Sequence, residues 1–309
     1  MPAPLSDTFS TVRDLLRFAV SRFTAAQLSF GHGLTNAYDE AAYLILHTLS
    51  LPLDLLDPFL DAHLTTDEIN AVLNVIERRV STREPAAYIT GEAWMHGLRF
   101  YVDKRVIVPR SLIGEVLLDG LQPYLEHPEE VGAVLELCTG SACLAILAAQ
   151  AFPAADIDAV DLSAPALEVA ARNVREHGLD ERIALFAGDL FAPLPPQYHG
   201  RYDVILANPP YVNAQSMRAL PAEYQHEPEM ALAGGEDGMD IVRRIIADAR
   251  AWLTSEGVLV IETGNERAHV EAAFGGLNLT WLPTSAGHDQ VFLIRAADLP
   301  VCRATGRGI

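Results

Sequence analysis

The stretch Asn208-Pro209-Pro210-Tyr211 has the residue types needed to hold a planar –NH2 group. It follows the mainly apolar run from Tyr202 to Leu206, whose short length and β-branched residues predict a buried strand. Two consecutive prolines continue neither a strand nor a helix, because neither has an N–H to donate. The chain therefore leaves the sheet at the carboxyl end of a strand, where open α/β sheets bind ligands.

Two acceptors and one aromatic face are available in this stretch. The side-chain carbonyl of Asn208 is one acceptor, and the backbone carbonyl of Pro209 is the other, because Pro210 keeps it outside a regular ladder. The ring of Tyr211 can stack on a planar amide or base. This arrangement would orient an amide or amino nitrogen for attack on an electrophile. The alternative is a proline-rich turn without chemistry, so the surrounding chain has to decide.

The predicted strand from Ala133 to Leu137 leads into the small-residue turn Cys138-Thr139-Gly140-Ser141-Ala142. Small residues let a ligand approach the backbone closely. Only Gly140 is a glycine, so the turn lacks the G-x-G-x-x-G pattern of a dinucleotide pyrophosphate site, which disfavours a nicotinamide dehydrogenase.

Two further strand ends suit a nucleoside. The strand from Ile157 to Asp161 ends in a carboxylate that could accept from ribose hydroxyls, or could open a helix-capping turn at Ser163. After the strand from Ile183 to Phe186, Asp189 could accept from an adenine amino group while Leu190 and Phe191 pack on the ring, or Asp189 could serve a tight turn. Taken in order, these strand ends predict an adenosine without phosphates facing an –NH2 substrate, as S-adenosylmethionine would.

Strands and helices alternate from residue 131 onward. Between the strands lie helices predicted at about Cys143 to Ala151, Ala164 to His177 and Gly238 to Leu253, the last followed by a strand from Val258 to Glu262. This alternation predicts a doubly wound parallel sheet. The segments Leu279 to Leu282 and Val291 to Ile294 have no helix between them, so one of these strands should run antiparallel.

Residues from about 8 to 84 have helical spacing, with a stripe at Val12, Leu15, Leu16 and Ala19 and a capping-box start at Thr65 to Glu68. We therefore expect a small helical domain over 1–84 and a hairpin and linker over 85–130. The hairpin should pair Tyr88 to Met95 with Leu98 to Val102 around His96-Gly97. A helix from Ser111 to about Leu125 should complete the linker.

Composition excludes several classes of function. The net charge is −19 with a single lysine, Lys104, so the basic footprint of a general DNA- or RNA-binding protein is missing, and a basic partner is favoured. No apolar run reaches membrane-spanning length. The residues from Met1 to Asp7 lack signal-peptide order, and the three cysteines have no metal-ligand spacing and suit a reducing cytoplasm.

With these motifs in order, residues 131–295 resemble the class I S-adenosylmethionine-dependent methyltransferases through LELCTGSACLAIL, AVDLS, GDLF and NPPY. Nearly the whole chain is similar to the HemK-like protein-glutamine N5-methyltransferases. FYVDKRVIVPRSLIGE and EYQHEPEMALAGGEDGMD resemble the branch that acts on large-subunit ribosomal protein L3. The release-factor branch typically continues the pair Pro109-Arg110 with a second proline and an acidic pair, whereas Ser111 follows here.

The resemblance implies a mostly parallel seven-stranded Rossmann-like sheet with helices on both faces over 131–309, with the helical domain recognising the substrate. It implies methyl transfer to a glutamine side chain, with the catalytic residues at Asn208, Pro209, Pro210 and Tyr211. Phe100 and Arg110 would line the substrate mouth. The cofactor would be held by Glu136, Cys138, Thr139, Gly140, Ser141, Asp161, Leu162, Asp189, Leu190, Phe191 and Asn208. Ala142 stands where many methyltransferases have a second glycine, which costs little unless that residue needs positive φ.

Other functions remain open at this point. The same clamp suits a release-factor glutamine or an exocyclic amino group of adenine, cytosine or guanine in nucleic acid. A non-catalytic adenosine-binding factor for ribosome assembly is an alternative of another class. The favoured reading is a cytoplasmic enzyme that uses S-adenosylmethionine, without a metal, on basic ribosomal protein L3, free or in an assembling particle. We expect no direct DNA binding and no membrane contact.

Overall fold

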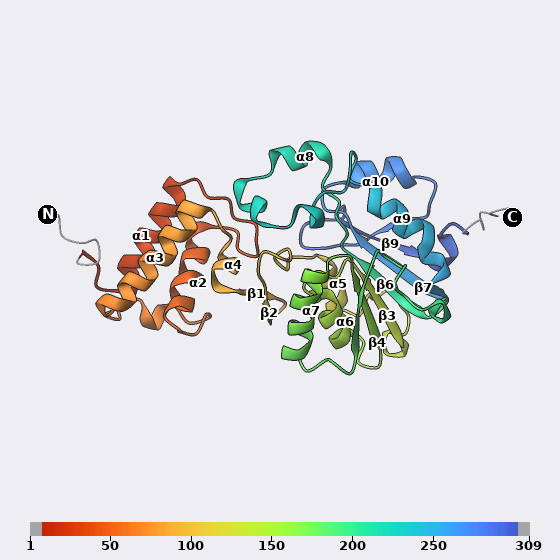
Figure 1. The fold of residues 1–309 in the computed structure, drawn as a ribbon, viewed down its shortest axis with the longest axis horizontal. Coiled ribbons are helices and arrows are strands. Elements are labelled where there is room, and N and C mark those ends of the chain that lie inside the picture. Colours follow the sequence, from red (N-terminus) through yellow and green to blue (C-terminus); the bar gives the residue numbers. More distant parts are fainter. Residues whose placement is uncertain (1–7, 302–309) are drawn as a thin grey trace.

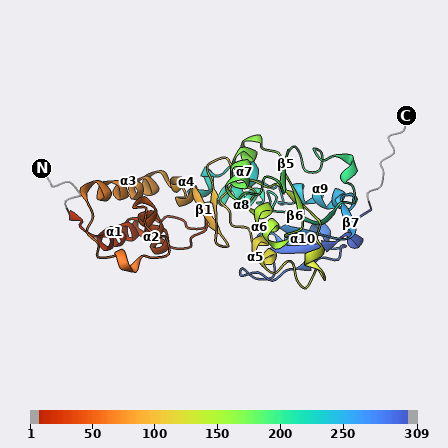
Figure 2. The same cartoon turned by 90° about the horizontal axis from the view of Figure 1, so that it is seen from below.

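The computed structural model describes residues 8–301. The N-terminal helices lie at one end of an elongated molecule, a large sheet flanked by helices lies at the other, and β1 and β2 lie between them (Figure 1). The view turned by 90° shows the same separation (Figure 2). The predictions made for Met1 to Asp7 and for Cys302 fall outside the described residues.

From residue 8 on, the N-terminal region contains three α-helices, α1 (Val12–Ala25), α2 (Ala37–Thr48) and α3 (Thr66–Thr82), with a short 3-10 helix, η2 (Asp57–Phe59), before α3. Each α-helix starts at a residue whose side chain accepts from the backbone N–H three residues on, and Thr65 with Glu68 forms the predicted capping box. The predicted stripe of α1 is confirmed as buried, and it packs against apolar side chains of α2 and α3.

The hairpin and linker differ in part from the prediction. Strands β1 (Glu92–Met95) and β2 (Leu98–Tyr101) pair antiparallel around His96-Gly97, as expected. The stretch predicted as the start of the first strand is instead a short helix, α4 (Ala86–Thr90), because the buried Tyr88 hydroxyl bonds the Val106 carbonyl at 2.5 Å. This contact comes from a distant segment, so local strand propensity did not reveal it.

The predicted helix from Ser111 to Leu125 is wrong in its second half. Helix α5 spans only Ile113–Leu118, and the chain turns at Asp119 and Gly120. Leu121 takes a φ of +60° and is fully buried, so the apolar position predicted inside a helix is in the core but in a turn. A short 3-10 helix, η3 (Pro128–Glu130), then precedes the sheet.

Seven strands of the described chain form one sheet in the order β5-β4-β3-β6-β7-β9-β8. The strands are β3 (Ala133–Leu137), β4 (Asp156–Asp161), β5 (Ile183–Ala187), β6 (Tyr202–Ala207), β7 (Leu253–Glu262), β8 (Thr280–Trp281) and β9 (Val291–Arg295). All neighbouring pairs are parallel except those made by β9, which confirms the mostly parallel sheet and the single antiparallel strand. β7 begins five positions before the predicted Val258.

Helices cover both faces of this sheet (Figure 1). α6 (Cys143–Ala151) and α7 (Ala164–Glu176) pack with α5 on one face, and α9 (Asp240–Asp248) and α10 (Arg267–Phe274) cover the other. Alternate residues of β3 and β6 enter the two cores: Val134 and Leu206 join the first, and Leu135 and Ile205 the second. α8 (Ala214–Ala219) lies outside these layers.

The strand order reverses between β3 and β6. From β3 the chain builds outward through β4 and β5, and it then returns to add β6 and β7 on the other side. The carboxyl ends of two such neighbouring strands diverge into helices on opposite faces, which opens a crevice between them. The crevice therefore lies where the predicted cofactor turn and the NPPY stretch leave the sheet.

Candidate active site

The turn after β3 and the NPPY stretch after β6 leave the sheet side by side. Leu137 is opposite Ala207 in the parallel ladder, so Cys138 and Asn208 start at the same level. Asp161, the last residue of β4, reaches across to this turn, and its carboxylate accepts from the Gly140 N–H at 2.8 Å and the Ser163 N–H at 2.8 Å. The three predicted strand ends thus meet at one edge.

The first cavity at this edge, the cofactor cavity, has a volume of about 150 Å³. Seven of the predicted cofactor residues line it: Cys138, Gly140, Asp161, Leu162, Asp189, Leu190 and Asn208. Burial raises the pKa of the Asp161 carboxyl, and backbone N–H groups from both sides oppose that rise. Asp189 also pairs with Arg244 at 2.7 Å, and both side chains are about half exposed.

Four of the predicted cofactor residues do not line this cavity. Glu136 is buried beneath the turn, where it accepts from the Thr139 hydroxyl and from the Ala145 N–H at 3.0 Å. Ser141 is also buried, and its carbonyl accepts from Asn173 at 2.9 Å. Phe191 stacks on Trp252 with ring centroids 5.6 Å apart. These residues support the turns around the cavity and do not line it. The direction of each side chain decides which of the two roles it has.

Glu136 has an unusual ionisation. Its burial raises the pKa of the carboxyl to about 8, although hydrogen bonds from Thr139 and Ala145 favour the charged form. A neutral carboxyl can both accept from the backbone N–H and avoid the cost of a buried charge. Glu136 is therefore part of the support of the turn.

Ala142 takes a left-handed conformation, with φ +63° and ψ 23°, as the N-terminal cap of α6. The condition under which alanine becomes costly at this position is thus met. A left-handed non-glycine residue costs roughly 1–2 kcal/mol. The Ala142 methyl group is fully buried in the core, which offsets part of that cost.

A second cavity of about 160 Å³, the substrate cavity, lies on the other side of Asn208. Pro209, Tyr211, Arg110 and Glu262 line it. Asn208 also lines the cofactor cavity, as do Ile107 and Ala231. Asn208 is only partly buried, and within residues 8–301 neither its side chain nor the Pro209 carbonyl has a hydrogen-bond partner. The two predicted acceptors therefore have no partner within residues 8–301; Asn208 lines both cavities, and Pro209 lines the substrate cavity.

The position of Tyr211 depends on close contacts with glycines. A Cβ at Gly264 would lie 2.7 Å from the Tyr211 ring, and a Cβ at Gly238 would lie 2.2 Å from its carbonyl oxygen. Val212, the next residue, forms a parallel bridge with Ala233, with its N–H 2.9 Å from the Leu232 carbonyl. Burial raises the pKa of the Tyr211 hydroxyl, so the ring stays neutral.

The bridge belongs to a segment that sequence reasoning used only for family resemblance. We call residues 220–235 the wall segment; it contains the short helices η5 (Ala222–His226) and η6 (Glu229–Ala231). Pro228, Met230, Ala231 and Ala233 line the cofactor cavity, and Tyr224 and Leu232 line the substrate cavity. The wall segment thus contributes to both cavities.

Arg110 holds the wall segment from the linker. Its guanidinium makes a two-pronged ion pair with Glu227, with N–O distances of 2.5 and 2.8 Å, and lies over the Tyr224 ring at 5.5 Å. Glu227 also accepts from the Val108 N–H at 2.9 Å. Burial disfavours the charge on Glu227, but the Arg110 guanidinium, together with the His32 ring 3.7 Å away, outweighs burial and lowers the pKa of Glu227 to about 2.

Phe100 does not lie where the resemblance placed it. Its ring is fully buried under the hairpin, in the core formed with α5, α6 and α7, and it packs on His177 with centroids 5.3 Å apart. It lines neither cavity. Because side chains alternate along β2, the fold directs Phe100 into the core, so its predicted place at the substrate mouth is wrong.

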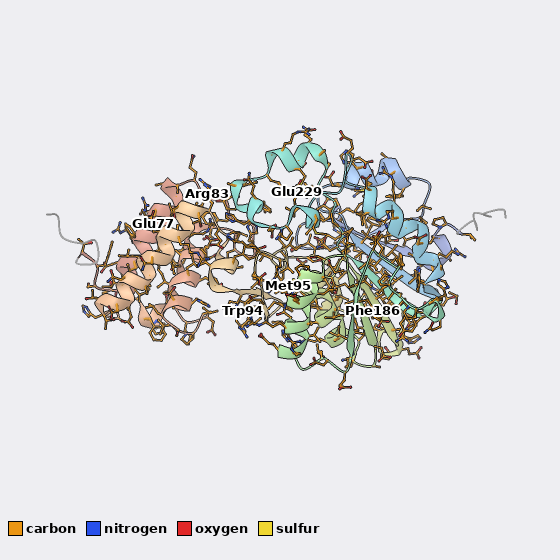
Figure 3. All side chains as sticks on the ribbon, viewed as in Figure 1. Glu77, Arg83, Trp94, Met95, Phe186 and Glu229 are labelled. Atoms are coloured by element: carbon orange, nitrogen blue, oxygen red, sulfur yellow. The ribbon has the colours of Figure 1, made fainter. Side chains whose placement is uncertain are left out.

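The N-terminal helices also hold the wall segment. Glu223, fully buried, accepts from the Ser29 N–H at 3.0 Å and from Arg83 at 2.9 Å, and the His226 ring bonds the Thr82 carbonyl at 2.9 Å. Figure 3 labels Arg83 where the helices meet the wall segment, which also carries Glu229. Sequence reasoning missed Glu223 and Glu227, which are two of the three acids in this short segment.

Comparison with known proteins decides the family. The chain is 72% identical over 297 residues to "Ribosomal protein uL3 glutamine methyltransferase" of Burkholderia pseudomallei (strain K96243), covering 94% of this chain and 96% of that protein. The protein of the same name from Bordetella pertussis (strain Tohama I) is 58% identical over 289 residues, covering 94% and 96%. The chain belongs to the ribosomal protein uL3 glutamine methyltransferases.

A comparison with protein-family models agrees with a methyltransferase. Residues 114–223 match the family described as methyltransferase small domain. Among solved structures, the catalytic domain of hMettl16 in complex with the MAT2A 3'UTR hairpin 6 is 14% identical with a TM-score of 0.49, covering 73% of this chain and 80% of that one.

No helix within residues 8–301 is both long and apolar enough to cross a membrane.

The cofactor of this enzyme family, S-adenosylmethionine, suits the residues at the cofactor cavity. The Asp161 carboxylate uses one lone pair of each oxygen on backbone N–H groups and keeps further acceptor sites for ribose hydroxyls. Leu162, Leu190 and Ile241 supply apolar surface for an adenine ring. No glycine-rich pyrophosphate turn is present in the described chain, in keeping with a cofactor that has no phosphates.

Proposed function

We propose that this enzyme transfers a methyl group from S-adenosylmethionine to the side-chain amide nitrogen of a glutamine in ribosomal protein uL3. The family membership supports the substrate, and one observation supports the chemistry. Asn208 lines both cavities, and its side-chain oxygen and the neighbouring Pro209 carbonyl have no partner within residues 8–301. Two free acceptors at the boundary between a nucleoside site and a second cavity suit an –NH2 group about to be methylated.

The residues of the chain overcome the low reactivity of a carboxamide. Its nitrogen is a poor nucleophile because its lone pair is delocalised into the carbonyl. Asn208 and the Pro209 carbonyl accept the two amide hydrogens and hold the nitrogen toward the cofactor cavity. Fixing two reactants in a near-attack geometry is worth about 7–11 kcal/mol of the barrier. S-adenosylmethionine, when bound, supplies an electrophilic methyl group.

The same acceptors also stabilise the positive charge that develops on the nitrogen during methyl transfer. As the nitrogen becomes positive, both N–H groups become stronger donors, so the hydrogen bonds to Asn208 and Pro209 strengthen during the reaction. No strong base is needed beforehand, because a methylated amide cation readily loses its proton to water. Tyr211 supplies a neutral ring that can stack on the amide. Pro210, between Pro209 and Tyr211, keeps this stretch in a turn outside the sheet.

Other assignments follow from this proposal. Residues 1–84 would recognise the substrate, 85–130 would form the hairpin and linker, and 131–309 would be the methyltransferase domain. Arg110 would shape the substrate cavity by holding the wall segment, because its guanidinium already pairs with Glu227. A ribosomal substrate supports a cytoplasmic location and a basic partner, free or in an assembling particle, for which the net charge of −19 is favourable.

The test replaces Asn208 with alanine and measures two quantities on the same protein. Transfer of labelled methyl from S-adenosylmethionine to purified uL3 should fall by about 10³-fold or more, since both positioning and charge stabilisation are lost. Cofactor affinity by calorimetry should stay within a factor of about 3. Asn278→Ala, at an exposed asparagine far along the chain, is the matched control. Equal loss of methyl transfer and cofactor binding would remove Asn208 from this role.

Substrate identity has its own measurement. Mass spectrometry of ribosomal proteins and release factors from cells lacking this enzyme should show loss of one methyl group on uL3 alone. A missing methyl group on a release factor, or on RNA, would replace uL3 as the substrate.

A further inference from the structure

A large cavity lies outside the active site, between the N-terminal helices and the hairpin. Its volume is about 690 Å³, compared with about 160 Å³ for the substrate cavity, and none of its lining residues lines either active-site cavity. We call it the interdomain groove. Its wall is mainly apolar and includes Leu34, Leu51, Leu53, Ala87, Trp94 and Val108.

The interdomain groove and the substrate cavity lie on two sides of the same short linker stretch, residues 107–110. Val108 and Pro109 line the groove, whereas Ile107 and Arg110, on either side of them, line the substrate cavity. His32 also lines the groove, and its ring packs on Tyr224 of the substrate cavity with centroids 4.4 Å apart. One stretch of linker therefore separates the two spaces, so a protein with a glutamine in one can reach the other with a neighbouring segment.

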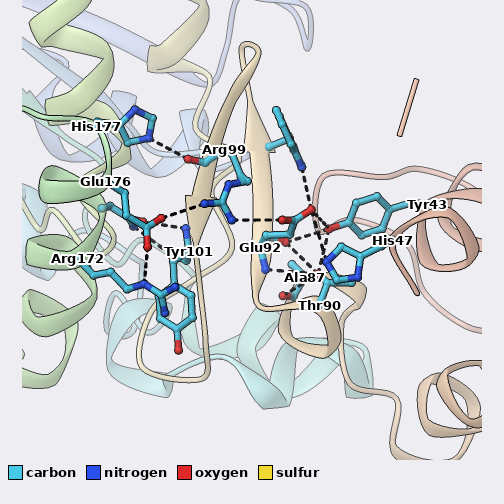
Figure 4. A network of polar contacts seen from close by, with 12 residues as sticks. Tyr43, His47, Ala87, Thr90, Glu92, Arg99, Tyr101, Arg172, Glu176 and His177 are labelled. Atoms are coloured by element: carbon cyan, nitrogen blue, oxygen red, sulfur yellow. Dashed lines mark hydrogen bonds and ion pairs between the residues drawn. The ribbon is translucent and has the colours of Figure 1, made fainter. Parts of the chain in front are cut away.

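Trp94 provides an anchor at the groove. Its side chain is 46% exposed, which is unusual for a large aromatic side chain, and exposed apolar surface beside a hollow is typical of protein interaction sites. The indole N–H donates to Glu92 at 3.2 Å. Figure 4 shows Glu92 at the centre of a network that also includes Tyr43, His47 and Arg99. Trp94 is thus held in place before any partner arrives, as interaction hot spots commonly are.

The charged residues that line the interdomain groove favour a positively charged binding partner. Asp54 and Glu92 are the acidic residues of its wall, and no Lys or Arg lines it. Arg99 contacts Glu92 at 3.5 Å but also pairs with Glu176, and His47 lies 3.8 Å from Glu92. Asp54 is exposed and pairs with no cation in the described part of the chain. The wall therefore presents apolar surface with unbalanced negative charge.

We propose that the interdomain groove binds a second segment of the substrate protein, an apolar side chain next to a lysine or arginine, while the target glutamine occupies the substrate cavity. This inference rests on the proposed function for the identity of the partner. The apolar side chain packs on Trp94 and the leucines, and the cation lies beside Asp54. The groove then discriminates the folded substrate from other glutamine-bearing chains.

The test measures the dissociation constant of intact uL3 by calorimetry, together with the kinetics of methylation. Trp94→Ala should weaken binding and raise KM by about 30-fold, with kcat unchanged at saturation, because a buried aromatic anchor is typically worth that much. Trp94→Phe should recover most of the affinity. Asp54→Asn should weaken binding about threefold at low salt and have no effect at 0.5 M salt, as expected for an exposed charge.

Matched controls come from exposed residues away from the groove. Leu118→Ala, at a 62% exposed leucine of α5, and Asp180→Asn, at an exposed acid after α7, should leave binding unchanged. Circular dichroism confirms that each variant is folded. Unchanged uL3 binding by folded Trp94→Ala would overturn the groove assignment and leave the proposed function intact. Binding of uL3 that depends on Trp94 without any methyl transfer by the wild type would instead overturn the proposed function. No binding by the wild type would overturn both.

Discussion

The cofactor cavity and the substrate cavity share Asn208 but are built in different ways. The cofactor cavity takes about half of its lining from the ends of β3, β4 and β5 and the turns after them, and most of the rest from the linker, the NPPY stretch and the wall segment. The substrate cavity combines the linker, the NPPY stretch, the end of β7 and the wall segment. Its cohesion depends on ion pairs such as Arg110–Glu227, whose partners are 117 residues apart in sequence.

The difference shows two ways to position reactive groups. Backbone N–H groups of adjacent turns hold Asp161, and the sheet itself sets their spacing. Around the substrate cavity, buried carboxylates hold the segments in place instead. Glu227 binds the linker, and Glu223 binds the N-terminal helices. Glu262 accepts from the Ser111 hydroxyl at 2.5 Å and from the Leu112 N–H at 2.8 Å. We therefore expect the substrate side to be the more sensitive to loss of single charges.

The strongest test of this comparison is Glu227→Ala. It leaves Arg110 partly buried without its partner, and breaking a buried ion pair typically costs about 3–5 kcal/mol. The free energy of unfolding, measured by denaturant titration, should fall by that amount, and methylation of uL3 should be lost with it. The control is Glu229→Ala, an exposed acid of the same wall segment. If both variants lost the same small amount, buried carboxylates would not be what holds the substrate cavity.

A pH experiment probes the support of the cofactor turn. The pKa of Glu136 is about 8 in the folded protein and ordinarily 4.5, so the folded state holds a proton that the unfolded state releases. The contribution of protonated Glu136 to the free energy of unfolding is fully present below about pH 4.5 and is lost as the pH rises to about 8. Relative to Glu136→Gln, the wild type should lose about 1.4 kcal/mol of unfolding free energy per pH unit across that window.

Denaturant titrations at pH 5, 6, 7 and 8 measure this slope. Glu130→Gln, at an exposed acid just before the sheet, should follow the wild type at every pH. Parallel curves for Glu136→Gln and the wild type would mean that Glu136 is ionised in the folded protein.

Asp161→Asn should have a smaller effect, mainly on the cofactor. An amide has one acceptor oxygen, which the Gly140 or Ser163 N–H would occupy, so less remains for ribose hydroxyls. Affinity for S-adenosylmethionine in calorimetry should fall by about 10–100-fold, or about 1.4–2.8 kcal/mol. Asp180→Asn on the surface serves as the control. Unchanged affinity would show that the carboxylate serves the turn alone.

The smallest effect is expected for Ala142→Gly. Relief of the left-handed conformation should gain about 1–2 kcal/mol. Loss of a buried methyl costs about 0.8 kcal/mol, and the added backbone entropy of glycine about 0.5–1 kcal/mol. The unfolding free energy should therefore change by less than about 1 kcal/mol, with cofactor affinity unchanged. A loss above about 2 kcal/mol would mean that packing of the methyl group dominates at this turn.

Local patterns predicted the sheet and the positions of most cofactor residues. Strand β3 was predicted at its observed bounds, and the NPPY stretch was placed at the end of β6, because buried strands and proline turns are set by neighbouring residues. The same reasoning failed at Tyr88, whose hydroxyl bonds the Val106 carbonyl, and beyond Leu118, where the chain turns at Gly120. The family resemblance, and not a local pattern, misplaced Phe100, whose side chain lies on the buried face of β2.

The sequence by itself determined the class of chemistry. The acceptors of Asn208 and Pro209, the small turn at Gly140 and the carboxylate of Asp161 each follow a strand, and parallel strands bring their carboxyl ends to one edge. Only the tertiary structure decided the rest: that Glu136 lies beneath the turn, that Glu223 and Glu227 hold the wall segment, and that a groove opens beside Trp94. Those features depend on side-chain direction and on partners far away in the chain, which spacing along the sequence does not encode.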